Sequence, residues 1–571
     1  MISKKTTKTC FALTALFAVN VMFANDHASL QSMIDKARKN NQRELIIPKN
    51  TYRLDKPLVF DKLKDIKIDG GGSTFLFTDI RANIMVINSD QLTLQNFTVD
   101  YSPLPFTQGD IVSVEPSARR MRIKLHTGYP SFPRMNRINA HIFDRASRSW
   151  KKGARDYFGR NLTATDKPDE FYVEMPEGFN SCVAVGDLVA FDWRFRSGFN
   201  IRNTKDFRMY DVTIHTSPSI AILGRFTTGK HHFERINICR GPLPEGATEA
   251  RLLSASADGL NYAYCEKGPD VINCDFSFMG DDSINYHSVA LPIVKVESPT
   301  SILVLRPYPL EGFPEVIKRG MELRLLDNKN FRVMGKGNIV SCKFEPGVDV
   351  PIEEVSALFR HYHPERDPRR SVYRLVLEKP MNFKTGLFVD IPPISGEDFV
   401  IRDNYFHDHR ARAIRMMASK GVIENNRIER IKQNAITVGG EYAYWREAGW
   451  VENLIIRNNT IKDVGLDERL TSQGSYAPGA ISLIMRSEEG VSDIASGNRN
   501  ILIENNLING CSGSGIVLHA VDGAIVRGNT IENVCHGDLS KAGADYGFKI
   551  SAPIETTPSA INVKLENNQI K

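Results

Sequence analysis

The feature that most constrains the fold is an internal repeat in the C-terminal third of the chain. Six strings share a central Asn, Asp or Gly followed by Asn: "VIRDNYFHD" at 400, "VIENNRIER" at 422, "LIIRNNTIKDV" at 454, "ILIENNLING" at 501, "IVRGNTIENV" at 525 and "VKLENNQI" at 563. The second residue of each central pair is Asn404, Asn426, Asn459, Asn506, Asn529 or Asn568. The shortest spacings, of 22 and 23 residues, indicate a solenoid whose coils carry loops of different length.

A second signature indicates which solenoid this is. A small residue, an aliphatic one, a variable one and another apolar one recur, as in Gly259-Leu260-Asn261-Tyr262 and Ser283-Ile284-Asn285-Tyr286. Short alternating strands joined by Asn or Gly turns are typical of a parallel β-helix, in which asparagine tolerates the left-handed region and bonds its neighbours. An antiparallel sandwich fits the alternation but not the constant phase of the asparagines. We therefore expect an all-β, right-handed parallel β-helix with the asparagines stacked along one edge.

Three further segments complete the expected organisation. Leu30, Met33, Ile34 and Ala37 share one face at helical spacing, which predicts a capping helix over 28–41. Two segments, 102–195 and 290–395, lack the asparagine signature and resemble each other, since "DIVSVEPSARRMRIKL" at 110 parallels "PIVKVESPTSILVLRP" at 292. We interpret them as two small β-barrel inserts. The β-helix then comprises 25–101, 196–289 and 396–571.

The N-terminus resembles a secretory signal peptide. Three lysines within the first eight residues precede the apolar run from Cys10 to Ala24, which is too short to span a bilayer stably. Cleavage near Ala24 would leave an exported protein, periplasmic or secreted, that begins near Asn25. No later segment is apolar enough to insert in a membrane.

The rest of the composition excludes several classes of function. Loss of the three N-terminal lysines lowers the formal net charge from +6 to +3, which gives no reason to expect nucleic acid as a partner. The other seven cysteines are scattered and form no CxxC pair, so we expect neither a zinc site nor a disulfide framework. No cofactor is expected, and the sequence does not indicate an oligomeric state.

The strongest candidates for chemistry lie in "NCDFSFMGDDSINYH", residues 273 to 287. Asp282 precedes Ser283 of the second signature, and Asp258 occupies the same column one coil earlier. Because stacked strands lie about 4.8 Å apart, Asp258, Asp281 and Asp282 should converge. Clustered carboxylates repel and raise one another's pKa, whereas glycosidic hydrolysis needs one protonated and one ionised carboxyl group. We therefore predict that these three aspartates are catalytic, although an Asp-Asp pair is often only a turn.

Other residues are candidates for substrate binding. The variable column holds Asn261, Asn285 and Arg415 near the aspartates, and these side chains suit sugar hydroxyl groups unless they are simply solvated surface. His287, just past the strand, is a further binding candidate or a turn histidine. Trp445 and Trp450 lie in a loop between two coils, where they could stack on a sugar or close the loop core.

With "SADGLNY" followed by "MGDDSINYH" on an interrupted β-helix, the chain resembles glycoside hydrolase family 110. That family comprises exo-acting α-1,3-galactosidases that remove terminal galactose from blood-group-B-type glycans. The resemblance implies an inverting, metal-independent hydrolase of oligosaccharides or glycoconjugates. Asp258 matches the candidate general acid, and Asp281 and Asp282 match the candidate general-base pair.

Two alternatives remain open at this point. Polygalacturonases share the fold and an aspartate followed one coil later by Asp-Asp, but they add a Gly-His-Gly that is absent here. Their Arg-Ile-Lys, which grips a uronate, does occur as Arg430-Ile431-Lys432. The other alternative is a glycan-binding β-helix without catalysis, which gives no reason for three converging aspartates.

Overall fold

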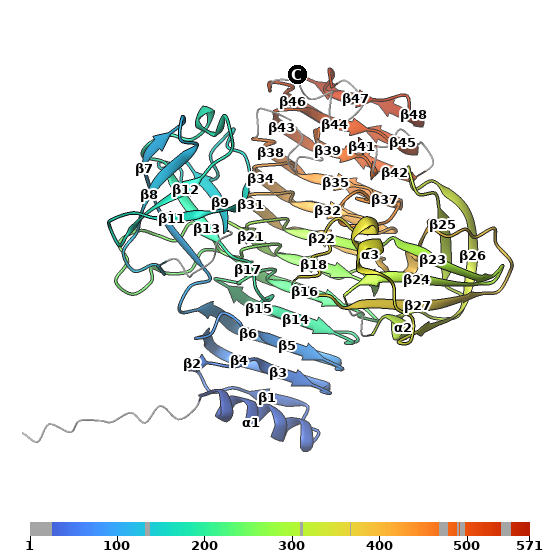
Figure 1. Ribbon diagram of the computed structural model, residues 1–571, viewed down its shortest axis with the longest axis horizontal. Helices are drawn as coiled ribbons and strands as arrows, with labels where there is room; N and C mark the ends of the chain where they lie inside the picture. The colour runs from blue at the N-terminus through green and yellow to red at the C-terminus, as the bar shows by residue number, and fades with distance from the viewer. Residues whose placement is uncertain are drawn as a thin grey trace, which may run out of the picture.

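The computed structural model describes residues 26–131, 138–308, 312–365, 367–466, 478–487, 490–491, 497–537 and 550–571. The predicted signal peptide lies outside these residues. Within them, the chain is a parallel β-helix with two inserts (Figure 1), so the predicted all-β, parallel β-helix class is confirmed.

Each complete coil contributes three strands. In one coil these are β30 (Val400–Arg402), β31 (Tyr405–His409) and β32 (Ile414–Met416), and in the next β33 (Gly421–Glu424), β34 (Arg427–Ile431) and β35 (Ile436–Val438). They pair in parallel, Val400 with Val422 and Ile414 with Ile436, which is the 22-residue spacing of the repeat. The inward aliphatic side chains stack into one continuous core.

The third strand of each coil belongs to a separate sheet, here called the site sheet. In the order of the coils its main strands are β3 (Leu58–Asp61), β5 (Ile84–Ile87), β14 (Phe199–Arg202), β16 (Ile222–Arg225), β18 (Leu260–Ala263), β22 (Ile284–Val289), β32, β35, β39 (Gly479–Leu483), β44 (Ser514–Leu518) and β47 (Ile554–Thr556).

The asparagines form the predicted ladder. Each Nδ2 donates to Oδ1 of the next asparagine at 2.9 Å, in the order Asn404, Asn426, Asn459, Asn506, Asn529 and Asn568. The residue before each is in the left-handed region, with φ between 53° and 63°. Asparagine suits this corner because its amide satisfies the buried backbone groups that a turn between strands leaves unpaired.

The N-terminal end of the solenoid is covered by α1 (Asp26–Lys39), which buries Leu30, Ile34 and Ala37 (Figure 1). The predicted capping helix is thus confirmed. Among the described residues, no helix has the length and apolar character needed to cross a membrane.

The first insert is an antiparallel sheet of seven strands: β7 (Phe106–Glu115), β8 (Arg120–Leu125), β9 (Ile138–Phe143), β10 (Tyr157–Arg160), β11 (Leu162–Ala164), β12 (Glu170–Glu174) and β13 (Leu188–Asp192). Its edge strands β10 and β11 are separated only by Asn161. The chain itself therefore joins the two edges, and no ladder between described residues closes the barrel that the sequence predicted.

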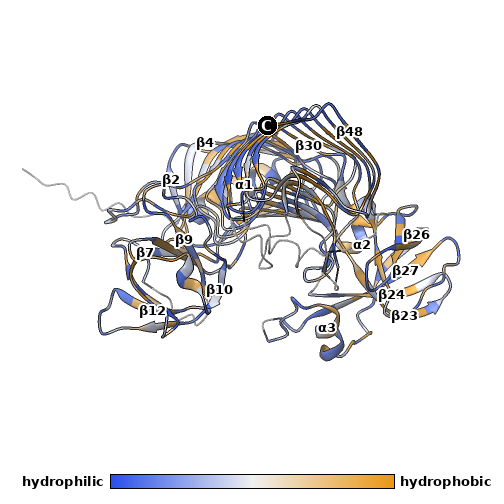
Figure 2. Cartoon of the chain, turned by 90° about the horizontal axis from the view of Figure 1, so that it is seen from above, coloured by the Kyte–Doolittle hydropathy of each residue, from blue (hydrophilic) through white to orange (hydrophobic). Residues whose placement is uncertain are grey.

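The second insert is a closed barrel of β23 (Leu291–Ser298), β24 (Ser301–Pro307), β25 (Glu322–Leu326), β26 (Val333–Phe344), β27 (Arg370–Leu377) and β28 (Phe388–Asp390). Figure 2 shows that both inserts project from the same side of the solenoid. They flank the coils that carry the aspartates.

Candidate active site

The three predicted aspartates meet just before two neighbouring strands of the site sheet, β18 and β22. β18 and β22 pair with Asn261 opposite Asn285, and the backbone N of Gly259 donates to the carbonyl of Asp282 at 2.8 Å. One carboxylate oxygen from each of Asp258, Asp281 and Asp282 lies within 4.8 Å of the others. We call these three residues the acid cluster. Stacking in register is what brings them together, as the column in the sequence predicted.

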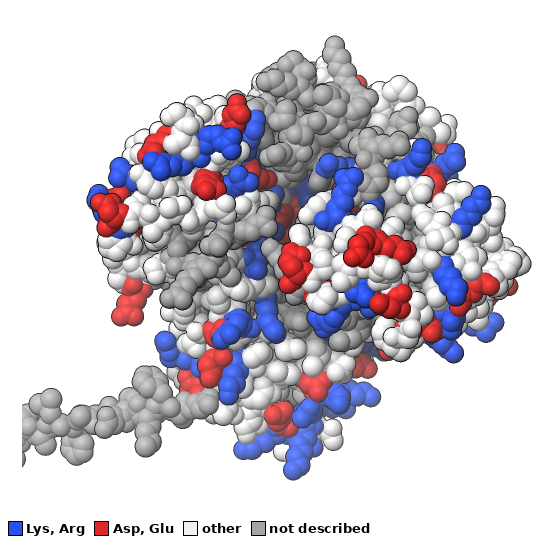
Figure 3. Space-filling model, in the orientation of Figure 1, with Lys and Arg blue, Asp and Glu red and all other residues white. Residues whose placement is uncertain are grey.

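The acid cluster lines a cavity of about 410 Å³ between the two inserts. Figure 3 shows the molecule hollowed there, with basic and acidic side chains inside the hollow. The site sheet forms the floor, and residues of the second insert, among them Arg306, Tyr308 and His361, form one wall. A cavity of this size suits one or two sugar rings.

Asp258 has the environment of a proton donor. Its side chain is buried, and its Oδ2 accepts from Nδ2 of Asn261 at 2.7 Å. Burial raises the pKa of Asp258 well above its usual value, and the negative charges of Asp281 and Asp282 raise it further. The carboxyl group of Asp258 is therefore the one that retains a proton.

Asp281 has the opposite environment. Its Oδ2 accepts from Arg194 at 2.8 Å, and its Oδ1 lies 2.9 Å from Nη1 of Arg410. Burial alone would raise the pKa of Asp281, but the guanidinium groups of Arg410 and Arg194 outweigh it and hold the pKa below its usual value. The carboxylate of Asp281 therefore stays ionised and can accept a proton.

Asp282 is fixed by the next coil of the solenoid. Arg412 donates Nε to Oδ1 at 2.9 Å and Nη2 to Oδ2 at 2.7 Å, and its backbone N also donates to Oδ1 at 2.8 Å. This bidentate pair orients Asp282 beside Asp281. Oδ2 of Asp281 and both carboxylate oxygens of Asp282 thus already accept hydrogen bonds from guanidinium groups.

The predicted binding residues line the same cavity. Asn261, Asn285 and Arg415 are paired in register across three coils. Their exposed fractions are only 5%, 5% and 2%, so the alternative that they are solvated surface is wrong. The second insert and the loop 439–450 form walls over this part of the sheet, which leaves these polar groups facing the cavity.

His287 also lines the cavity and lies within β22, not in a turn. Its Nδ1 donates to the carbonyl of Ser288 at 2.8 Å. Burial, reinforced by the charge of Arg225, lowers the pKa of His287 to about 3, so the ring is neutral. Its Nε2 then carries a lone pair and lies 3.7 Å from Oε1 of Glu447.

The two loop tryptophans have different surroundings. Trp450 is buried among Phe331, Phe388 and Tyr442, and its Nε1 donates to the carbonyl of Phe331 at 3.0 Å, so it closes the loop core. Trp445 is 48% exposed and lines the cavity. Trp450 therefore has the role of closing the loop core, and Trp445 is the tryptophan that is placed where it can contact a sugar.

Several site residues were missed by the sequence reasoning. Arg412 could have been found, because it directly precedes Ala413 and so continues the column of Asp258 and Asp282. Arg410 lies two residues before Arg412 in the same coil, level with Gly280 of the coil before. Six others come from the inserts or from the loop 439–450, where no periodic signal exists: Arg194, Glu441, Glu447, Arg306, Tyr308 and His361.

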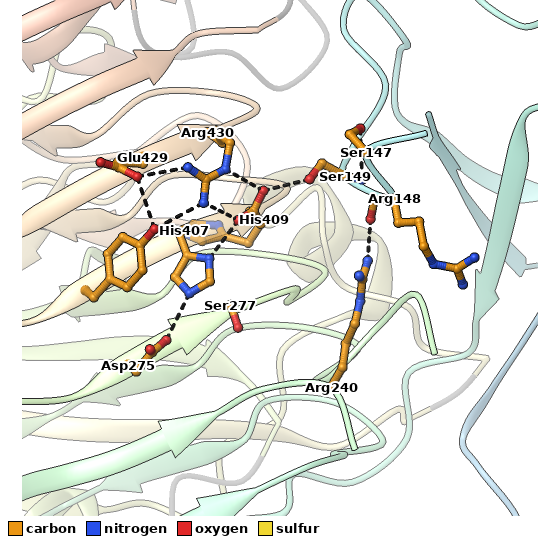
Figure 4. A network of polar contacts seen from close by, with 12 residues as sticks. Ser147, Arg148, Ser149, Arg240, Asp275, Ser277, His407, His409, Glu429 and Arg430 are labelled. Carbon is orange, nitrogen blue, oxygen red and sulfur yellow. Dashed lines mark hydrogen bonds and ion pairs between the residues drawn. The ribbon is translucent and has the colours of Figure 1, made fainter. Parts of the chain in front are cut away.

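The Arg-Ile-Lys of the polygalacturonase alternative is used structurally. Arg430 donates to Asp408 and Glu429 on the outer face of the solenoid (Figure 4), and Ile431 is in the core. Lys432 Nζ donates to Asp156 of the first insert at 2.5 Å. Neither cation lines the cavity, so this motif provides no grip on a uronate.

Comparison with known proteins adds a relationship. No protein-family model matches the chain. It is 25% identical over 530 residues to alpha-1,3-galactosidase A of Bacteroides thetaiotaomicron, across 87% of this chain and 84% of the relative. The chain is similar to the α-1,3-galactosidases over most of its length. Alpha-1,3-galactosidase B of the same organism is 22% identical, across 80% and 78% of the two chains, and that of Akkermansia muciniphila is 21% identical, across 84% and 60%.

Among solved structures, the chain is similar to the A-module of mannuronan C-5 epimerase AlgE4 from Azotobacter vinelandii. The alignment covers 95% of this chain and 96% of the A-module. The identity is 10% and the TM-score 0.41, a likeness on which no argument about function rests.

Proposed function

We propose that this protein is an exo-acting α-1,3-galactosidase of glycoside hydrolase family 110, acting on oligosaccharide or glycoconjugate glycans such as the blood group B antigen. The names of its relatives support a glycosidase that acts on galactose. The observation that carries the proposal is the pairing of a carboxyl group of raised pKa with a carboxylate of lowered pKa in one cavity. Glycosidic hydrolysis needs this division.

In the proposed mechanism, Asp258 donates its proton to the glycosidic oxygen as the bond to the anomeric carbon breaks. Asp281, assisted by Asp282, accepts a proton from the water that attacks that carbon. Asp281 and Asp282 lie side by side and together can accept both hydrogens of one water, whereas a retaining mechanism needs a single nucleophile. This pairing supports inversion of configuration.

The spacing of the carboxylates argues in the other direction. The nearest oxygens of the acid cluster lie within 4.8 Å of one another. Acid and base in inverting sites are usually roughly 6.5–9.5 Å apart, and about 5–5.5 Å in retaining sites. Proton NMR during turnover of an α-galactoside decides between the two: β-galactose should appear first, and α-galactose appearing first would refute inversion.

The substrate is tested by incubating the purified protein with three glycans. Release of galactose from the B-type trisaccharide and from the linear α-1,3-digalactoside is expected, with no release of sugar from polygalacturonate. The Asp258→Asn variant is the matched control, because galactose release that came from a contaminating galactosidase would be the same in the wild-type and variant preparations. Tight binding of B-type trisaccharide without release of galactose would favour the non-catalytic glycan-binding alternative.

We further propose that the protein is exported, to the periplasm or the medium, after cleavage near Ala24. The support is the basic and apolar N-terminal sequence, residues 1–24. Sequencing the N-terminus of the protein recovered from its native cell tests this proposal. A start near Asn25 is expected, and an intact Met1 would contradict export by this route.

A further inference from the structure

Trp445 differs from the other three tryptophans of the chain in its exposure. It is 48% exposed, whereas Trp150, Trp193 and Trp450 are 4%, 6% and 2% exposed. It also lines the cavity of the acid cluster. An exposed apolar ring in a cavity lined mainly by polar side chains is removed from water only when a ligand with an apolar face covers it, and this burial favours binding.

Trp445 is held in place at its backbone by Glu441 and at its indole by His361. Glu441 is buried, and its Oε2 accepts from the backbone N of Trp445 at 2.8 Å. On the side of the second insert, His361 packs against the indole with ring centroids 5.4 Å apart. His361 also donates Nδ1 to the carbonyl of Tyr444 at 2.8 Å. Because both supports fix the loop before any ligand binds, little entropy is lost when a ligand stacks on the ring.

We propose that Trp445 is the stacking platform for the terminal galactose and selects it over glucose, an inference that rests on the proposed function. The axial O4 of galactose leaves the C–H bonds at C3, C4 and C5 on one face as a continuous apolar patch. The equatorial O4 of glucose places the C4 hydrogen on the opposite face and interrupts that patch. An indole therefore covers galactose more completely, while Asn285 Oδ1 and Arg415 Nη1, which are buried and have no hydrogen-bond partner among the described residues, remain available for its hydroxyl groups.

Tryptophan emission tests this directly, because Trp445 is the exposed indole. Adding D-galactose should shift the emission to shorter wavelength and reduce quenching by acrylamide, and D-glucose at the same concentration should do neither. The Trp445→Phe variant should lose the response while calorimetry still detects galactose binding. In kinetics on an aryl α-galactoside, Trp445→Ala should raise KM roughly ten-fold with little change in kcat, as expected for lost ground-state binding.

Phe344 provides a matched control. It is also 48% exposed but lies on β26 outside the cavity, so Phe344→Ala should leave KM unchanged. A galactose response that persists in Trp445→Phe, or an unchanged KM in folded Trp445→Ala, would overturn the platform. Failure of the proposed function has a different signature, since the wild-type protein would then release no galactose from the B-type trisaccharide or the linear α-1,3-digalactoside.

Discussion

Arg194 connects the first insert to the acid cluster, and its removal makes the sharpest test of the electrostatic reasoning. Arg194 follows β13, donates Nη1 to Asp281 at 2.8 Å and lies over Phe158. Its positive charge lowers the pKa of Asp281 and also that of Asp258. Arg194→Gln retains an N–H donor on a shorter side chain but removes the charge, so the pKa values of both carboxyl groups should rise.

The size of the effect follows from the contact. Two unit charges about 4 Å apart interact by roughly 4 kcal/mol at an effective dielectric constant of 20. The Arg194 side chain is 31% exposed, which screens this interaction, and Arg410 remains on the other oxygen of Asp281. We therefore expect the pKa of Asp281 to rise by about one unit, equivalent to about 1.4 kcal/mol. Asp258 does not contact Arg194 directly, and its pKa should rise by less.

The assay is the pH dependence of kcat/KM on an aryl α-galactoside. On the acid side, activity falls as Asp281 takes up a proton, so a raised pKa moves this limb to higher pH by about one unit. The alkaline limb, where Asp258 loses its proton, should move in the same direction by less. Arg202→Gln is the control, because Arg202 lines the same cavity but donates Nε to Asn200. An acid limb that stays in place, or moves to lower pH, in folded Arg194→Gln would refute the reasoning.

Two further predictions test the chemistry and the fold. Asp258→Asn should lower kcat about 10²- to 10⁴-fold on digalactosides but far less on aryl galactosides with acidic phenols, whose departure needs no proton; equal losses on both would rule out a general acid. Asn459→Ala removes a side chain that makes four hydrogen bonds in the ladder, and it should lower the free energy of unfolding in urea by about 2–4 kcal/mol. The control is Lys564→Ala at an exposed position, which should change the free energy of unfolding by less than about 0.5 kcal/mol. Similar urea midpoints for the two variants would contradict a stabilising role of the asparagine ladder.

The sequence predicts those parts of the site that the repeat places in register. The column that holds Asp258 and Asp282 is defined by the small residue that follows each, and parallel pairing turns that phase into proximity. The same column extends to Arg412, although 130 residues and the second insert separate it from Asp282. The insert leaves the solenoid and returns to it without changing the register, since Asn285 still pairs with Arg415.

The burial of the site could not be predicted in this way. Asn261, Asn285 and Arg415 point away from the solenoid core, which in an uninterrupted β-helix means toward water. They are buried because the second insert and the loop 439–450 wall in this part of the site sheet, a tertiary contact with no periodic signal. The positions of Arg194 and His361 depend on the same docking of the inserts, so these two residues, which contact Asp281 and Trp445, could not be deduced from the repeat.

The stacking that defines the solenoid also explains why its like charges do not simply repel. Adjacent coils place Asp258 and Asp282 one strand spacing apart, so the cluster is most stable when one carboxyl group keeps a proton. The cations are distributed unevenly: Asp281 and Asp282 accept from guanidinium groups, whereas Asp258 accepts from the neutral amide of Asn261. The proton is therefore driven to Asp258. The distribution of arginines, rather than the aspartates themselves, decides which carboxyl group keeps the proton and which stays ionised.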